Sequence, residues 1–152
     1  MDKENILTLV KKWTAEVGLT VREIADPRVN LHILINEPNL PGIDLVHPKA
    51  EDTYVLFISS IGISDEDRKK LLDINKEKRE ALLWIIRQRL ILMGVEFRLE
   101  RGDDIPTVWH VYARLYFQNP STQNFWETYL KIKNASFLIS WAIHEGLDLR
   151  IL

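Results

Sequence analysis

The segment VEFRLERGDDIPTVWHVYARLYF, residues 95–117, decides the fold of this chain. Its two parts, Val95 to Arg101 and Thr107 to Gln118, alternate between apolar and polar residues, and the residues between them run from Gly102 to Pro106. Alternation with a period of two is typical of β-strands, and a short loop containing glycine joins antiparallel neighbours. The segment therefore predicts a β-hairpin.

Helical patterns stand on both sides of this hairpin. Before it, Ser64 and three acidic residues form a strong helix start, and the pattern continues to Met93, with Gly94 as the expected stop. Unbroken, this long central helix of about 29 residues measures about 43 Å. After the hairpin, an apolar stripe from Ser121 to Glu145 predicts a C-terminal helix that Gly146 closes.

The N-terminal part adds one helix and a run of strands. Apolar residues from Ile6 to Val17 recur at helical spacing before Gly18, and an antiparallel meander of three or four strands is predicted after it. Its segments are Leu19–Ala25, Val29–Asn36, Ile43–His47 as a short edge strand, and Thr53–Ser60 as a central strand covered on both faces. The tail Leu147–Leu152 could add an edge strand or cover the core. Grouped helices with antiparallel strands predict an α+β fold, here as one domain over residues 1–152.

Composition excludes several classes of protein. The 152 residues carry 20 basic and 22 acidic side chains, a net charge of -2, and 46% of them are hydrophobic. The chain has no cysteine, which excludes disulfides, a thiolate nucleophile and cysteine-ligated metal. The basic residues of the central helix are interleaved with acids, so no nucleic-acid partner is expected. Neither a signal peptide nor an apolar stretch of bilayer length is present, so we expect a cytoplasmic protein without a membrane partner.

The search for catalytic and cofactor motifs is negative. The chain has no glycine-rich phosphate loop, no HExxH and no GxSxG. The densest group of metal-ligand types, Asp44, His47, Glu51 and Asp52, has no recognised spacing. We therefore expect no cofactor, no metal site and no catalytic residue.

One face of the second hairpin strand carries a mixed set of side chains. His110, Tyr112, Arg114 and Tyr116 share this face, and the neighbouring strand adds Glu96, Arg98 and Glu100 at the same parity. This face is interpreted as a solvated surface, a protein interface or an active site. Tyrosine and arginine are enriched at interfaces, whereas the sequence ties no nucleophile or orienting carboxylate to these residues.

The second half of the central helix, ALLWIIRQRLILM, is apolar around most of its circumference. Such a helix is normally buried on more than one side. The third helix, the first helix or a second subunit could cover what the sheet does not, and a two-fold dimer is the commonest closed arrangement. Trp84, Arg87 and Ile91 are the candidate interface residues of this helix, beside His110, Tyr112, Arg114 and Tyr116 of the hairpin.

The order of elements resembles the type III secretion chaperone-like fold, which sensory-transduction-regulator-like families and small uncharacterised archaeal families share. The resemblance lies in the strands VNLHILI and TYVLFISSIGIS, the capped helix from Ser64 to Met93, the hairpin and the helix from Ser121 to Glu145. It covers nearly the whole chain as topology, without a chemical motif. It implies a non-enzymatic module, often dimeric through its long helix, that binds protein segments.

Two functional hypotheses follow. The first is a non-enzymatic homodimeric protein-binding module, chaperone-like or regulatory, with a protein or peptide partner. The alternative is a small-molecule or metal-dependent enzyme on the sheet face around His110, with His32, Tyr112 and Arg114. Convergence of these four side chains in one pocket is the observation that favours the enzyme.

Overall fold

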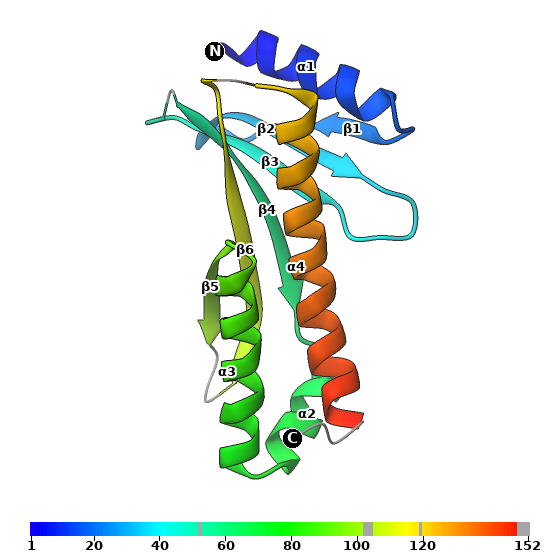
Figure 1. The fold of residues 1–152 in the computed structure, drawn as a ribbon, viewed down its shortest axis with the longest axis vertical. Coiled ribbons are helices and arrows are strands. Elements are labelled where there is room, and N and C mark those ends of the chain that lie inside the picture. Colours follow the sequence, from blue (N-terminus) through cyan, green and yellow to red (C-terminus); the bar gives the residue numbers. More distant parts are fainter. Residues whose placement is uncertain (52, 102–104, 119, 149–152) are drawn as a thin grey trace. The chain divides into compact units, whose positions relative to one another are not determined.

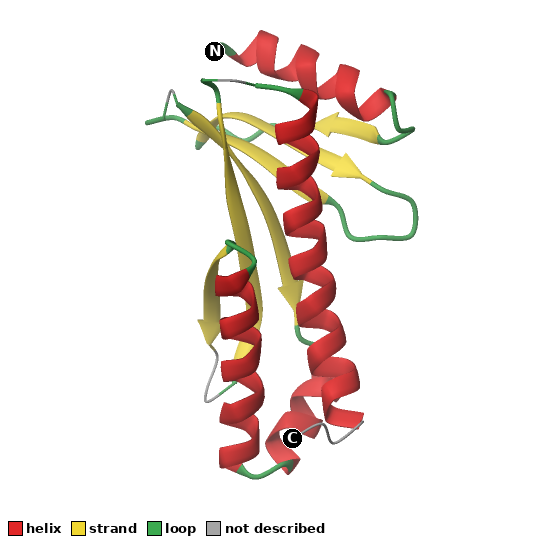
Figure 2. Cartoon of the chain, viewed as in Figure 1, coloured by secondary structure: helices red, strands yellow, loops and turns green. Residues whose placement is uncertain are grey.

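The computed structural model describes residues 1–51, 53–101, 105–118 and 120–148 (Figure 1). The chain divides into two compact units, which we call unit 1 (Met1–Ser59 with Tyr112–Ile132) and unit 2 (Ser60–Val111 with Lys133–Leu152). Helices and strands are grouped rather than alternating strand by strand, which confirms the α+β class (Figure 2). The assignment of one domain to the whole chain stays a prediction.

The strands form a six-stranded sheet in the order β1-β2-β3-β4-β6-β5. The first four, β1 (Thr20–Glu23), β2 (Val29–Asn36), β3 (Ile43–Pro48) and β4 (Tyr54–Gly62), pair antiparallel in sequence order, as the predicted meander requires. The prediction of β3 as an edge strand was wrong, since it pairs with β2 on one side and β4 on the other. The prolines and glycine before β3 form the loop that brings it between its neighbours.

The hairpin prediction is confirmed by β5 (Glu96–Arg101) and β6 (Pro106–Tyr116), which are neighbours in the sheet. Residues 102–104 of the predicted turn lie outside the described part of the chain. Helix α4 (Thr122–Asp148) does not end before Gly146 as predicted but continues through it. A glycine inside a helix costs only about 1 kcal/mol, so helical hydrogen bonding can outweigh its preference for a stop. The tail beyond residue 148 lies outside the described residues.

In unit 1, helices cover one face of the sheet. Helix α1 (Lys3–Ala15) buries an apolar stripe of Ile6, Val10 and Trp13, and the Trp13 ring lies 5.1 Å from that of Phe125 in α4. Phe125 also contacts Phe57 of β4, with ring centroids 5.3 Å apart. The strand residues on this face are buried: Leu31, Ile33, Ile35, Leu45, Val55 and Phe57.

In unit 2, the predicted central helix is in two pieces, α2 (Asp65–Asp73) and α3 (Lys76–Leu92). Ser64 caps the first, as predicted, by accepting a hydrogen bond from Asp67 N. The chain then turns at Ile74, whose backbone is extended, and the Asn75 side chain caps α3. The buried Arg79 donates from Nη1 to the carbonyl oxygen of Leu71 at 3.2 Å, which links the two helices. The new cap and this hydrogen bond offset the interruption of the helix.

Helix α3 packs against β5 in unit 2. Its core face carries Leu82, Leu83, Ile86 and Leu90, all buried. The helix ends at Leu92 with Met93 as its C-cap, and Gly94 adopts a positive φ of 68°, which confirms the predicted stop.

Candidate functional site

The β6 side chains named from the sequence follow the predicted alternation. Trp109, Val111, Ala113 and Leu115 are buried, and the intervening side chains of the candidate face are half-buried or exposed. Of these, His110 belongs to unit 2, whereas Tyr112, Arg114 and Tyr116 belong to unit 1. The two groups have separate contacts and are described in turn.

In unit 1, Arg114 and Tyr116 form a cluster with Tyr54 of β4. The rings of Tyr54 and Tyr116 meet edge to face with centroids 5.7 Å apart. The Arg114 guanidinium carbon lies 5.2 Å from the Tyr54 ring centroid, a cation–π contact. Planar side chains held against one another lose little conformational entropy when a partner binds, which suits an interface.

Tyr54 is a member of this cluster that the sequence did not single out. The segment 53–60 predicts a strand covered on both faces because it is almost continuously apolar. In the structure β4 alternates instead: Val55, Phe57 and Ser59 are buried, while Tyr54 is half-buried. No signal in the sequence places Tyr54 in this cluster, because the pairing of β4 with β6 involves residues far apart in the chain.

In unit 2, His110 connects a hydroxyl to a carboxylate. Ser60 Oγ lies 2.8 Å from His110 Nδ1, and His110 Nε2 lies 2.8 Å from Glu100 Oε1. The sequence named His110 and Glu100 on one face but missed Ser60, since it ends a segment that was interpreted as an apolar strand. The connectivity is that of a nucleophile, a base and an orienting acid. All three residues are at least partly open to solvent.

The predicted enzyme set is not assembled in one place. His32 lies on β2, which β3 and β4 separate from β6 in the sheet. Its Nε2 is 2.7 Å from Asp44 Oδ1, and its Nδ1 is 3.6 Å from Asp26 Oδ2. Hydrogen bonds from Arg28 hold the pKa of Asp26 well below its usual range. These contacts therefore link β2 and β3 to the loop between β1 and β2.

The acidic and histidine residues near β3 do not converge either. His47 is buried and lies 2.6 Å from the carbonyl oxygen of Glu51. Asp44 is three residues earlier on the strand, so it points to the opposite face, toward His32. Asp52 lies outside the described residues. Within the described ranges, no group of three or more histidine and acidic side chains is arranged to hold a metal ion.

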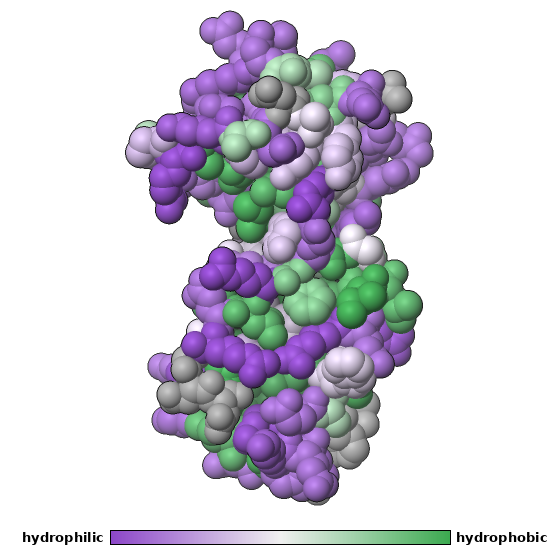
Figure 3. Space-filling view, turned by 90° about the vertical axis from the view of Figure 1, so that its left-hand side faces the viewer, coloured by the Kyte–Doolittle hydropathy of each residue, from purple (hydrophilic) through white to green (hydrophobic). Residues whose placement is uncertain are grey.

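On α3, two of the three candidate residues are well exposed. Trp84 is 56% and Ile91 63% exposed, while Arg87 is half-buried. Ile85 at 40% and Leu92 at 80% are further exposed apolar residues of α3 that were not predicted from the sequence as interface residues. Figure 3 shows hydrophobic side chains reaching the surface on the side that carries α3 and β5. Residues three or four apart share a helix face, so Trp84, Ile85, Gln88, Ile91 and Leu92 form one row, which we call the α3 seam.

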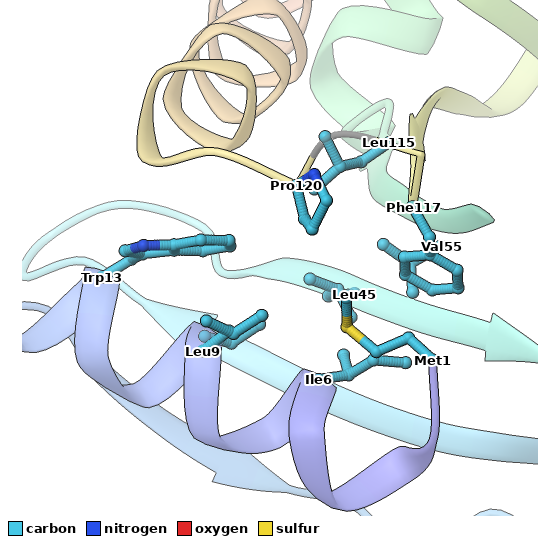
Figure 4. A pocket seen from close by; sticks show the side chains of 10 residues that line it. Met1, Ile6, Leu9, Trp13, Leu45, Val55, Leu115, Phe117 and Pro120 are labelled. Carbon is cyan, nitrogen blue, oxygen red and sulfur yellow. The ribbon is translucent and has the colours of Figure 1, made fainter. Parts of the chain in front are cut away.

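A small cavity under α1 belongs to the core. Figure 4 shows Ile6, Leu9 and Trp13 of α1 turned toward Leu45 and Val55 of the sheet. The cavity measures about 20 Å³, and its lining is entirely apolar. A space of this size without polar partners does not hold an ordered water or a ligand.

A larger groove in unit 1 lies between the end of β6 and α4. Its volume is about 310 Å³, and it is lined by Arg114, Leu115, Tyr116, Gln118, Asn124, Glu127, Thr128 and Lys131. A hollow of about 240 Å³ in unit 2 is lined in part by Asp67 and His144, whose Oδ1 and Nδ1 atoms are 3.4 Å apart. Ser60 and His110 line none of these three spaces.

The fold and these surfaces define a small α+β protein whose most distinctive features are an aromatic sheet cluster and an exposed helix seam. The chain belongs to the family of uncharacterized conserved proteins DUF2299, whose model matches residues 6–143. In the part of the chain that is described, no helix is both long and apolar enough to cross a membrane.

Solved structures include similar chains. An uncharacterized protein from Methanothermobacter thermautotrophicus has a TM-score of 0.84 and 25% sequence identity, over 92% of this chain and 97% of that one. YbjN from E. coli has a TM-score of 0.45 and 14% identity, over 95% and 93%, and this weaker likeness carries no argument. None of the curated proteins matches the chain.

Proposed function

We propose that this chain is a non-enzymatic protein-binding module, chaperone-like or regulatory in kind, that acts as a homodimer. The observation that carries the proposal is the α3 seam, where four large apolar side chains stand in solvent on one helix face. Contiguous apolar patches on a folded protein mark interaction sites, because their burial is favourable once a partner is present.

The sequence of the seam favours a second copy of the chain as the partner. Residues 84–92 read WIIRQRLIL, which is nearly the same in both directions about Gln88. A two-fold axis beside Gln88 pairs two antiparallel α3 helices so that Ile85 faces Ile91 and Trp84 faces Leu92. An interface between identical copies must be self-complementary in this way.

The flanks of the seam fit an interface rim. Arg87 and Arg89 lie on either side of Gln88, about 100° around the helix from it, because each residue advances the helix by that angle. They therefore stay at the solvent edge of an antiparallel pair. An apolar centre with a charged rim is the usual composition of a protein interface.

The exposed fractions give the strength of the association. Together the four side chains expose the equivalent of between two and three fully exposed residues per copy. At about 2 kcal/mol for each, the two copies contribute about 10 kcal/mol. Association costs about 4 kcal/mol or more, which leaves at most about 6 kcal/mol, so we expect a weak dimer with a Kd of roughly tens of micromolar.

The sheet cluster is the proposed contact for other proteins. Tyrosine and arginine dominate the binding energy of many interfaces, and Tyr54, Arg114 and Tyr116 combine both types in unit 1. The surface has no arranged metal ligands among the described residues, which favours binding over metal-dependent chemistry.

The dimer is tested by sedimentation velocity over a concentration series. Leu92→Asp removes an 80% exposed side chain from the seam, whereas Leu72→Asp makes the same chemical change at a 57% exposed site on α2. We expect wild type and Leu72→Asp to associate at concentrations of roughly tens of micromolar and above, and Leu92→Asp to remain monomeric over the same series. A monomeric wild type, or equal association of both variants, contradicts the proposal.

A second candidate function is acyl transfer at Ser60, favoured by its hydrogen-bonded connection to His110 and Glu100. In that reaction His110 Nδ1 takes the hydroxyl proton as Ser60 Oγ attacks the carbonyl carbon, then returns it to the leaving group, and water releases the acyl group. A fluorophosphonate probe tests it, with exposed Ser140→Ala as the matched control for Ser60→Ala. Labelling that only Ser60→Ala abolishes supports an enzyme, and no labelling of wild type removes this candidate.

A further inference from the structure

We propose that the end of β6 binds an extended acidic segment of a partner protein, which adds to the sheet as a further strand. This inference rests on the proposed protein-binding function and names the class of partner and the place where it binds. The residues proposed to contact the partner all belong to unit 1.

Among the described residues of unit 1, no strand pairs with one side of β6. The strands of this unit follow the order β1-β2-β3-β4-β6, so β6 is an edge strand there. Its next neighbour, β5, has 6 residues against 11 in β6 and is joined to it at the Pro106 end. The stretch that ends at Tyr116 therefore extends past β5.

The hydrogen-bonding direction of this stretch follows from one observed bond. Phe117 N donates to the carbonyl oxygen of Thr53 at 2.8 Å, so Phe117 turns its backbone groups toward β4. In an antiparallel pair, alternate residues direct both backbone groups to the same side. Leu115 therefore also faces β4, whereas Tyr116 directs its N–H and C=O to the open edge. Such an edge is a template for another extended chain.

The groove described above lies along this edge and supplies side-chain contacts. Its wall on α4 carries Asn124, Glu127 and Lys131, and its volume of about 310 Å³ leaves space for side chains of an added strand. Glu127 already accepts a hydrogen bond from Gln123 at 2.8 Å. Lys131 is exposed on the same wall, and Arg114 adds a second basic side chain to the lining.

This charge pattern favours an acidic partner over a second copy of the edge. The lining has two basic side chains and one acidic side chain. If two copies paired through this edge, the charged side chains of both grooves would lie in the same region. The basic side chains of the two copies would then repel each other. A glutamate or aspartate on the partner strand complements Lys131 instead. Alternating side chains would place one such acid in the groove.

The test is isothermal titration of the full-length protein with a short capped peptide of alternating valine and glutamate. Tyr116→Pro removes the edge N–H without removing a bond to β4, and Tyr116→Ala is its control because it removes only the ring. We expect Tyr116→Pro to bind the peptide about three- to tenfold more weakly than Tyr116→Ala, as one lost hydrogen bond requires. Equal affinity of the two variants overturns the edge proposal.

Two further measurements do not depend on the proline variant folding. The same peptide with N-methyl groups on alternate backbone nitrogens is expected to lose binding to the wild-type protein. A lysine version of the peptide is expected to bind poorly to wild type and better to Lys131→Glu. Equal binding of the methylated peptide, or no preference between acid and lysine versions, contradicts the inference.

Sedimentation of the same samples separates this inference from the proposed dimer. A dimeric protein that ignores every peptide refutes the strand-binding edge and leaves the α3 interface standing. A monomeric protein that binds the acidic peptide refutes the α3 interface and supports the edge. Tyr116→Pro is expected to leave the mass of the dimer unchanged, because the seam lies in unit 2.

Discussion

Oppositely charged substitutions in the α3 seam test whether two copies of the chain pair through this helix. Ile91 is 63% and Ile85 40% exposed in the isolated chain. At about 2 kcal/mol for complete burial, loss of the two Ile91 contacts in a dimer costs about 2.5 kcal/mol and loss of the two Ile85 contacts about 1.6 kcal/mol. Ile91→Glu alone should therefore weaken the dimer roughly 70-fold and Ile85→Lys roughly 15-fold.

A mixture of the two variants should behave differently from either one. In an antiparallel heterodimer, the lysine at position 85 of one copy faces the glutamate at position 91 of the other copy. The second contact, between the unchanged Ile91 and Ile85, remains intact. The ion pair stabilises the heterodimer by about 0.2 to 1 kcal/mol. The heterodimer also avoids the cost of each homodimer, in which a charged side chain is buried against an apolar one. With one variant isotope-labelled, native mass spectrometry should find heterodimers well above half of all dimers. A statistical half, which is expected when α3 makes no contact in the dimer, refutes the reasoning.

Three further predictions concern the folded chain. Asn75→Ala should destabilise the protein by about 1 kcal/mol in urea unfolding, because α3 loses its N-terminal cap, and unchanged stability would contradict that role. Because the pKa of Asp26 is lowered in the folded state, its contacts with Arg28 stabilise the fold above the ordinary aspartate pKa of 3.8, and this stabilisation is lost as the pH falls below that value. Asp26→Asn should therefore reduce the dependence of the free energy of unfolding on pH in the acid range. Burial and the hydrogen bond to Glu37 raise the pKa of Tyr129, so the protonated Tyr129 stabilises the fold below pH 10, and this stabilisation is lost as the pH rises above it. Thermal melts at a series of pH values should show that Tyr129→Phe removes this loss of stability at alkaline pH.

The sequence predicted elements whose signals are local. The alternation of Val95–Phe117, the Ser64 cap and the stop at Gly94 each appear in the structure. The break at Ile74 was missed because the helical pattern continues through it in the sequence. Asn75 was the available signal, since asparagine is a strong helix cap.

The candidate surfaces were predictable only where they depend on local sequence patterns. Period-two alternation placed the β6 residues on one face, but it could not show that Ser60 and Tyr54 lie opposite them. That information depends on how β4 and β6 are paired, which involves residues far apart in the sequence. Trp84 and Ile91 of the α3 seam were named from the sequence as interface candidates, whereas Ile85 and Leu92 could not be told from the core face until packing showed which side faces the sheet.

The central claim, a two-fold α3 interface beside Gln88, is tested most directly by disulfide cross-linking, since the chain has no native cysteine. When the axes of two facing helices are 8 to 10 Å apart, the Cα atoms of the two copies of residue 88 are about 3 to 5 Å apart. The upper part of this range overlaps the Cα–Cα distances that a disulfide spans. The exposed Ala81 lies on the same face, but its two copies would be about 21 Å apart along the helices. We predict that Gln88→Cys forms covalent dimers under mild oxidation and that Ala81→Cys does not. Cross-linking of both variants, or of neither, would contradict the account.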